Sequence, residues 1–337
     1  MTHTRPLFDI YPQLAGVLPW RQLAELPTPV EPLARVGANA WIKRDDVSHA
    51  VYGGNKIRKL EFILADVIAR GKDHVITFGA TGTNHGVATA MLCQQLGIDC
   101  TVLLFDQPES STVRDNLSRM KAFGAELIFC GSLAKTVMRY YCHPQRLSRK
   151  HYFLFAGGSN IAGTIGFVNA AFELQQQIET GQCPMPSRIV MPVGSAATLA
   201  GLTIGVALAG LKIEVVGIRV APSHLGPIPT CTVATINRLM RQTSRALSRR
   251  GVTLPAIPPP RLIDTYYGDG YGVRTEAGDK ATARLAASGI TLDQTYTAKA
   301  AAAFLDFLGA SADVQLYWHT YNSRPVHNFN DVRPPGI

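Results

Sequence analysis

The sequence predicts an α/β protein of two lobes, each built on a mostly parallel sheet flanked by helices. Short apolar segments alternate with segments of helical periodicity between residues 40 and 130, and the alternation returns between residues 187 and 220. Strands that alternate with helices form parallel sheets with helices on both faces. The 337 residues, 46% of them hydrophobic, provide enough material for two such lobes.

The first half of the chain shows the clearer alternation. Short apolar runs predict strands, and longer segments carry apolar residues at helical spacing. Gly97 and Gly124 follow two of the predicted helices, as glycine often does at a helix end. The expected strands are 40–43, 74–78, 100–105 and 126–130, and the expected helices are 59–69, 84–96 and 112–123.

The second half repeats the pattern. We expect strands at 187–193 and 213–220, a helix at 196–211 and a loop through the proline-rich segment 253–260. Ligands of open parallel sheets bind at the carboxyl ends of the strands, so we expect the functional site there, between the lobes.

Composition argues against several classes of protein. No apolar run reaches the roughly 18 residues of a spanning helix, and the N-terminal residues lack the apolar core of a signal peptide. We therefore expect a cytoplasmic protein with no membrane partner. The cysteines are scattered without metal-ligand spacing, so we predict free thiols and no metal site; they are Cys93, Cys100, Cys130, Cys142, Cys183 and Cys231.

The net charge of +9 is partly concentrated in Arg238, Arg241, Arg245 and Arg249, which recur at helical spacing. A nucleic-acid-binding surface would carry interleaved aromatic residues or a known motif, and neither accompanies these arginines. We interpret them as a solvated helix face, or as a face that helps attract anionic substrates, and we expect no nucleic-acid partner.

Gly53-Gly54-Asn55-Lys56 places a lysine at the junction of a loop and a helix. Glycines let the backbone approach a ligand closely. Such a lysine serves as a nucleophile when burial or neighbouring cations lower its pKa, and Arg58 and Lys59 are suitable cations. The alternative is an ordinary helix start with solvated basic residues.

Two later loops each follow a strand and precede a helix. The first runs from Gly79 to Gly86, and the second contains Gly194, Ser195, Ala196, Ala197 and Thr198. Backbone amides at a helix N-terminus bind anions, and the second loop suits a phosphate group. Taken alone, each loop is also explained as a close-packed or capped helix start without a ligand.

The phosphate group in question is not that of a nucleotide. The chain has no GxxxxGK[ST] motif, and the spacing of its glycines does not fit GxGxxG. One lysine, one phosphate-binding loop and one polar loop between two α/β lobes are what a pyridoxal-phosphate site requires, since this cofactor supplies the carbanion chemistry itself.

Lys43 to Asp46, followed by Gly-Gly-Asn-Lys-Ile-Arg-Lys-Leu-Glu at 53–61, resembles the D-cysteine desulfhydrase and 1-aminocyclopropane-1-carboxylate deaminase family. These are fold type II, tryptophan-synthase-β-like enzymes that use pyridoxal 5′-phosphate. The resemblance covers most of the chain in an ordered series of motifs, namely Thr83-Asn84-His85, Gly157-Gly158-Ser159-Asn160, Gly163, Gly166-Phe167, 194–198, Tyr271-Gly272, 293–300 and His319-Thr320.

The resemblance implies how the cofactor is held. Lys56 forms a Schiff base with pyridoxal phosphate, Asn55 lies beside it, and Asn84 bonds the cofactor's 3′ oxygen. Thr297 or Thr320 meets the pyridine nitrogen, and residues 194–198 hold the phosphate. The implied domains are a large cofactor-binding domain of residues 1–50 plus 167–337 and a small domain of residues 51–166.

The resemblance also implies residues that act on the substrate. Thr83 faces the substrate near its carboxylate. Tyr296 lies against the cofactor ring and acts in proton transfer, and Tyr271 reaches into the substrate pocket. A homodimer is implied as well.

The implied activity is that of a lyase acting on a small amino acid with a leaving group on its β-carbon, with D-cysteine as the leading substrate. Lys56 removes the α-proton, the leaving group departs, and hydrolysis yields a keto acid and ammonia. The alternatives are a β-replacement synthase, the deaminase, and a non-catalytic protein that binds the cofactor or an amino acid. The deaminases carry Tyr-Glu where this chain has Tyr296-Thr297, and the missing carboxylate argues against cyclopropane ring opening.

Three departures from the family pattern indicate a remodelled substrate pocket. Ala196 and Ala197 replace two glycines of the phosphate loop, and they still present their amides unless the loop needs a positive φ. Thr83 replaces a serine, which adds a methyl group on the substrate side. Tyr321-Asn322 replaces Gly-Gly, which places a bulky tyrosine beside the ring.

Overall fold

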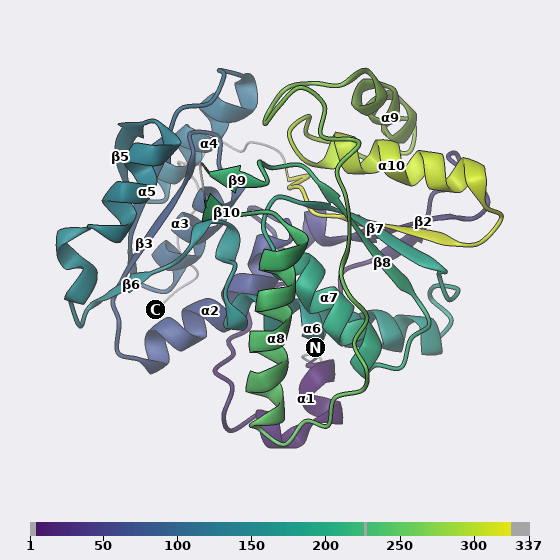
Figure 1. Cartoon of the computed structure of the whole chain (residues 1–337), viewed down its shortest axis with the longest axis horizontal. Helices are drawn as coiled ribbons and strands as arrows, with labels where there is room; N and C mark the ends of the chain where they lie inside the picture. The colour runs from purple at the N-terminus through teal and green to yellow at the C-terminus, as the bar shows by residue number, and fades with distance from the viewer. Residues whose placement is uncertain (1–4, 226–227, 325–337) are drawn as a thin grey trace.

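The computed structural model describes residues 5–225 and 228–324 and contains two main sheets (Figure 1). In the larger sheet only β1 runs antiparallel to its neighbour, while the other strands pair in parallel. Its strands, in spatial order, are β1 (Val30–Pro32), β2 (Ala40–Arg44), β12 (Gln315–His319), β7 (Arg188–Val193), β8 (Glu214–Arg219) and β11 (Arg261–Ile263).

The smaller sheet is parallel throughout. Its strands, in spatial order, are β5 (Glu126–Gly131), β4 (Asp99–Phe105), β3 (His74–Ala80) and β6 (His151–Phe153). A separate antiparallel pair, β9 (His224–Leu225) and β10 (Ile228–Pro229), lies near the smaller sheet in Figure 1.

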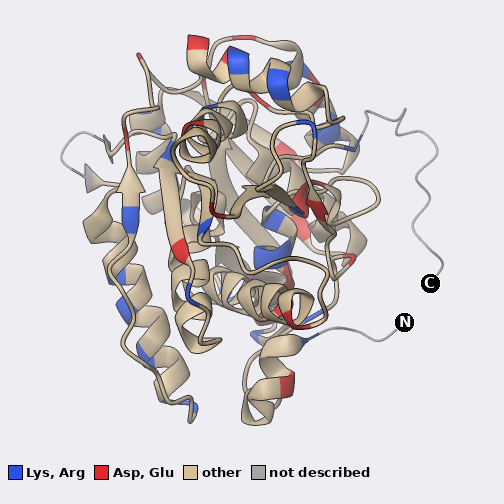
Figure 2. Ribbon diagram, turned by 90° about the vertical axis from the view of Figure 1, so that its right-hand side faces the viewer, with Lys and Arg blue, Asp and Glu red and all other residues tan. Residues whose placement is uncertain are grey.

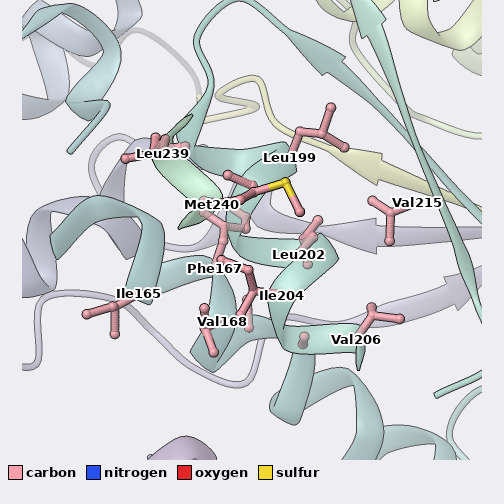
Figure 3. Close-up of a cluster of buried hydrophobic side chains, with 14 of the residues drawn as sticks. Ile165, Phe167, Val168, Leu199, Leu202, Ile204, Val206, Val215, Leu239 and Met240 are labelled. Atoms are coloured by element: carbon pink, nitrogen blue, oxygen red, sulfur yellow. The ribbon is translucent and has the colours of Figure 1, made fainter. Parts of the chain in front are cut away.

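Helices cover both faces of the larger sheet. Side chains alternate along β7, so Ile189 and Met191 pack into one core, while Val190 packs into the other. The first core, part of which is drawn in Figure 3, is closed by α1 (Pro6–Ile10), α6 (Ile161–Glu179), α7 (Ala197–Leu208) and α8 (Val233–Ser248). The second is closed by α9 (Glu276–Ala286) and α10 (Thr297–Ala310).

The smaller sheet is covered in the same way. Val102 and Leu104 of β4 face a core that includes α2 (Lys56–Ala69), α3 (Asn84–Gln95) and α4 (Ser111–Ala122). Leu103 faces the opposite side, where α5 (Leu133–Tyr141) packs. Short 3₁₀ turns complete the described elements: η1 (Pro12–Leu14), η2 (Asp45–Val47), η3 (Pro144–Leu147) and η4 (Ala156–Gly158).

The predicted fold class is confirmed, and every strand and helix expected from the sequence is present with small shifts at the ends. The largest shifts are three residues, at the end of α7 and at the start of α2, which begins at Lys56 rather than at residue 59, so Lys56 occupies the first helical position. The predicted boundary between residues 166 and 167 falls inside α6, a helix that packs on α2 and α7 alike. The division into domains stays a prediction.

Among the described residues, no helix combines the length and the apolar character needed to cross a membrane. The six cysteines are free thiols. The four arginines singled out in the sequence lie on α8 or at its C-terminal cap, along a helix without acidic residues (Figure 2, left edge). Arg238 also lines the mouth of the cavity described below.

A buried ion network joins β2, α2 and α6 behind the functional site. Glu173 accepts hydrogen bonds from Arg58 at 2.8 and 2.9 Å and from Lys43 at 2.6 Å. Arg58 also bonds Asp45 at 2.8 Å. Burial by itself raises the pKa of Glu173, but the positive charges of Arg58 and Lys43 outweigh burial and lower that pKa to about 2. Glu173 is therefore ionised inside the core.

Candidate functional site

A cavity of about 490 Å³ lies between the two sheets, and both lobes contribute to its wall. Its volume falls in the range of roughly 300–1,000 Å³ that is typical of small-molecule sites. Most residues predicted for the site line this one cavity, namely Asn55, Lys56, Thr83, Asn84, Gly194, Ser195, Ala196, Thr198, Tyr271, Tyr296 and Thr320. Ala197 and Thr297 are not among its lining residues.

Lys56 occupies the start of α2 and points its amine into the cavity. Its Nζ donates to Oδ1 of Asn55 at 2.8 Å, and Nδ2 of Asn55 donates to Oγ1 of Thr198 at 3.1 Å. Asn55 thus joins the lysine to the loop predicted to hold phosphate. Burial lowers the pKa of Lys56 to about 8, and the nearby carboxylate of Asp293 opposes this shift. Part of the Lys56 population therefore carries a neutral amine at neutral pH, and the neutral amine is the nucleophilic and basic form.

The expectation that Arg58 and Lys59 depress the pKa of Lys56 is wrong. Arg58 is turned into the buried network, where Glu173 and Asp45 neutralise it. Burial lowers the pKa of Lys59 itself well below the usual range, and its amine donates to the carbonyl of Gly157 at 3.0 Å. Burial, not neighbouring cations, shifts the pKa of Lys56.

The glycine turn before Lys56 rests on the segment that follows β12. The N–H of Asn55 donates to the Thr320 carbonyl at 3.1 Å, and the N–H of Gly53 donates to Oδ1 of Asn322 at 2.7 Å. Gly54 has a φ of 102°, and a Cβ there would lie 2.9 Å from the Thr320 oxygen. Position 54 therefore requires glycine, both for its backbone conformation and for this close approach.

Thr83 and Asn84 form the N-terminus of α3. The Thr83 hydroxyl accepts from the Gly86 N–H at 3.2 Å, which leaves its own proton for a ligand. The amide oxygen of Asn84 accepts from Tyr52 and from Asn116, each at 2.9 Å, so its amide nitrogen is the group left to face the cavity. An amide N–H there suits a phenolic oxygen such as the cofactor's 3′ oxygen.

The methyl group that distinguishes Thr83 from serine packs on its own helix. A Cβ added at Gly86 would lie only 2.5 Å from the Thr83 methyl carbon. The expectation that this methyl lies on the substrate side stays a prediction, and Thr83 itself lines the cavity. The other expected change in the pocket is present, because Tyr321 lines the cavity.

The loop from Gly194 to Thr198 leads into the N-terminus of α7. No side chain caps this helix at Ala196. The only side-chain contact to its first amides in the described structure is a long one, 3.4 Å between the Ala197 N–H and Oγ of Ser159. The first amides of α7 are therefore available to an anion. Ala196 has a φ of −64° and a ψ of −32°, so the alanines of this loop need no positive φ. At Gly194, a Cβ would lie 3.1 Å from the Tyr296 ring, so any larger residue there would press on that ring.

Tyr271 and Tyr296 lie edge to face with their ring centroids 5.9 Å apart, and their hydroxyl groups are hydrogen-bonded to each other. Burial raises the pKa of Tyr271 to about 12 and that of Tyr296 well above 10. Both phenols are therefore protonated at neutral pH, and the pair carries protons that it can donate into the cavity.

The structure separates the two threonines proposed for the pyridine nitrogen. Thr297 is fully buried, and its hydroxyl donates to Oδ1 of Asp293 at 2.7 Å. Thr320 lines the cavity instead. These positions support Thr320 as the partner of the pyridine nitrogen.

Asp293 lines the cavity as well, and the sequence placed it in the motif 293–300 without indicating a role. Its carboxylate accepts from the N–H groups of Thr295, Tyr296 and Thr297 at 3.0, 2.8 and 3.1 Å. It therefore fixes the backbone of Tyr296 and binds the N–H of Thr297, the first residue of α10. The available signal was the place of this aspartate at the start of the motif 293–300.

Comparison with known proteins agrees with this geometry. Residues 21–314 match the family described as pyridoxal-phosphate dependent enzyme. The chain is 33% identical over 301 residues to the D-cysteine desulfhydrases of Salmonella paratyphi B and Salmonella newport, with 86% of this chain and 88% of each relative covered. The crystal structure of an ACC deaminase homologue matches with a TM-score of 0.80 and 29% identity, covering 98% of both chains. The processed form of threonine deaminase isoform 2 from Solanum lycopersicum, at 14% identity and a TM-score of 0.65 over 94% of this chain and 85% of its own, shares the fold.

The chain therefore belongs to the pyridoxal-phosphate-dependent enzymes and is a lyase or deaminase of fold type II. Within that class it falls in the family of the D-cysteine desulfhydrases and ACC deaminases, as the motifs predicted. The residues of the cavity fit the cofactor, because an amine, an uncapped helix N-terminus and an amide nitrogen are present where an aldehyde, a phosphate and a phenolic oxygen need them.

Ser195→Asp is expected to weaken binding of pyridoxal phosphate by at least about tenfold, because a carboxylate would lie against the phosphate dianion. Fluorescence titration of the cofactor-free protein measures the effect. Ser110→Asp is the matched control, since Ser110 caps α4 outside the cavity and aspartate also caps helices well. Unchanged affinity in Ser195→Asp would contradict the assignment of this loop.

Proposed function

We propose that this protein is a lyase that removes a β-substituent and the amino group from a small amino acid, with D-cysteine as the leading substrate. Pyruvate, sulfide and ammonia would be the products. One observation carries the proposal: a lysine of lowered pKa, two helix N-termini and a protonated tyrosine pair line a single cavity. The names of the Salmonella relatives support D-cysteine.

Different residues of the chain remove the α-proton and hold the substrate carboxylate. When bound, pyridoxal phosphate withdraws electrons from the substrate's α-carbon. Lys56 Nζ, oriented by Asn55, takes the α-proton. The Thr83 hydroxyl and the N-terminus of α3 hold the substrate carboxylate.

The two tyrosines complete the reaction. Tyr296 donates a proton to the departing sulfur, and Tyr271 holds the Tyr296 hydroxyl in place through their hydrogen bond. Because burial raises the pKa of both phenols, each keeps its proton at neutral pH. We also propose that the protein acts in the cytoplasm, as its composition leads us to expect, and that it forms a homodimer, as the family resemblance implies.

The test is product analysis with D-cysteine, L-cysteine and 1-aminocyclopropane-1-carboxylate as separate substrates. We expect pyruvate, sulfide and ammonia from D-cysteine and no 2-oxobutyrate from the cyclopropane substrate, since neither Thr297 nor Thr320 provides a carboxylate for the pyridine nitrogen. A second nucleophile added to the D-cysteine reaction should not divert the product. Ring opening, or diversion into a new amino acid, would overturn the proposed elimination.

A further inference from the structure

The outer part of the cavity has an apolar wall supplied by the smaller lobe. Leu133, Val137 and Tyr141 recur every four residues, so they form one face of α5. Phe78 and Phe155 adjoin this face and pack edge to face with their centroids 5.1 Å apart. The aromatic part of the wall is therefore already ordered by its own contacts.

This wall is only partly buried. Phe78 is 4% exposed and belongs to the core on this side of the smaller sheet, and Val137 packs against that core. Tyr141 is 51% exposed and Phe155 is 36% exposed, whereas Tyr140 on the neighbouring face of α5 is 3% exposed and packs on the sheet. An exposed apolar surface inside a ligand cavity indicates a site for an apolar ligand group.

The larger lobe faces this wall from α8 and the segment before it. Leu239, Ala221 and Pro222 contribute apolar surface, and Arg238 and Gln242 form a polar rim. The apolar region is continuous with the cavity that contains Lys56 and Thr83. A side chain attached to the substrate's β-carbon can therefore extend from the reacting centre between α5 and α8.

Free cysteine cannot use this region, because its side chain ends one atom beyond the β-carbon. We propose that the enzyme accepts cysteine conjugates whose sulfur carries an aromatic or branched aliphatic group, and that the wall of Leu133, Val137, Tyr141, Phe78 and Phe155 binds this group. The inference rests on the proposed elimination and names the substrate class of the same site.

The reaction of such a conjugate balances with water alone. S-benzylcysteine and water give pyruvate, ammonia and phenylmethanethiol. Lys56 takes the α-proton, the bond between the β-carbon and sulfur breaks with its electron pair on sulfur, and the sulfur gains a proton. Hydrolysis of the bond between carbon and nitrogen then releases ammonia.

Binding is measured first, with acids that lack the amino group and therefore cannot react. Calorimetry on the holoenzyme compares 3-(benzylthio)propanoate with 3-(methylthio)propanoate. We expect the benzyl compound to bind at least about tenfold more tightly, the gain from burying a phenyl ring. Equal affinity in the wild-type protein would overturn the proposal without reference to any variant.

Variants of α5 locate the binding surface. Val137→Asp should abolish the preference for the benzyl compound, because it places a carboxylate in the apolar wall. Met138→Asp is the matched control, since Met138 is the next residue, is 63% exposed and does not line the cavity. A preference that survives Val137→Asp, or that Met138→Asp also abolishes, would contradict the assigned surface.

Turnover separates this inference from the proposed function. Pyruvate is assayed from D-cysteine and from both enantiomers of S-methylcysteine and S-benzylcysteine. A higher kcat/KM for a benzyl conjugate than for its methyl counterpart supports the subsite. Pyruvate from cysteine without any benzyl preference would overturn the subsite and leave the elimination standing, and preferential benzyl binding without pyruvate from any substrate would overturn the elimination.

Discussion

Replacement of Lys56 by alanine is expected to lower pyruvate formation by at least about 1,000-fold, because in the proposed mechanism this one side chain both attaches the cofactor and takes the α-proton. Its position at the start of α2, with Nζ held 2.8 Å from Asn55, is the reason for expecting so large an effect. Steady-state assay of pyruvate measures the loss, and the absorption spectrum reports whether the cofactor is still attached.

Two controls accompany this experiment. Lys121→Ala removes an exposed lysine on α4 and should leave activity unchanged. Lys56→Arg keeps the positive charge but cannot attach the cofactor, so it should be as inactive as the alanine variant. Near-normal turnover in Lys56→Ala would contradict the role assigned to this residue, whatever the cofactor content of the protein.

Glu173→Gln is expected to lower the free energy of unfolding by about 3–5 kcal/mol, the usual effect of breaking a buried ion pair. The loss arises because Lys43 would stay buried without its carboxylate partner, and Arg58 would keep only Asp45. Urea denaturation of the cofactor-free protein measures it. Glu179→Gln is the matched control, since Glu179 is exposed at the end of the same helix.

The same carboxylate predicts how stability depends on pH. The folded-state pKa of Glu173, about 2, lies below its ordinary value of 4.5. Its contribution is therefore present in full above about pH 4.5 and is lost as the pH falls toward 2. The wild-type protein should lose more stability over this interval than Glu173→Gln does. Equal losses in the two proteins would contradict the assigned ionisation.

The fold was largely predictable because local patterns determine it. The strand of residues 74–80, the turn at 81–83 and the helix from Asn84 follow directly from an apolar run, a glycine and a threonine cap. Lys56 and the loop at 194–198 were found in the same way, since each lies at a loop-to-helix junction that a sequence displays.

What the sequence did not show depends on contacts between distant segments. Glu173 lies more than 100 positions from Lys43 and from Arg58 in the sequence, so its ion pairs with them could not be predicted. For this reason Arg58 was expected to act on its sequence neighbour Lys56, whereas the structure pairs it with Glu173. The choice of Thr297 or Thr320 as partner of the pyridine nitrogen depends on which of the two hydroxyl groups is hydrogen-bonded to Asp293. That depends on the direction of the side chains, which sequence spacing does not show. The apolar face of α5 lines a cavity only because α8 lies on the other side of it, and the sequence does not show that the two helices face each other.

The most direct test of the central claim is to find the lysine that carries the cofactor. Purified protein is saturated with pyridoxal phosphate, reduced with borohydride and digested, and the modified peptide is sequenced by mass spectrometry. We predict one phosphopyridoxyl group, on the peptide that contains Lys56 and on Lys56 itself. A label on Lys59 or on another lysine, or no stable label after reduction, would contradict the account.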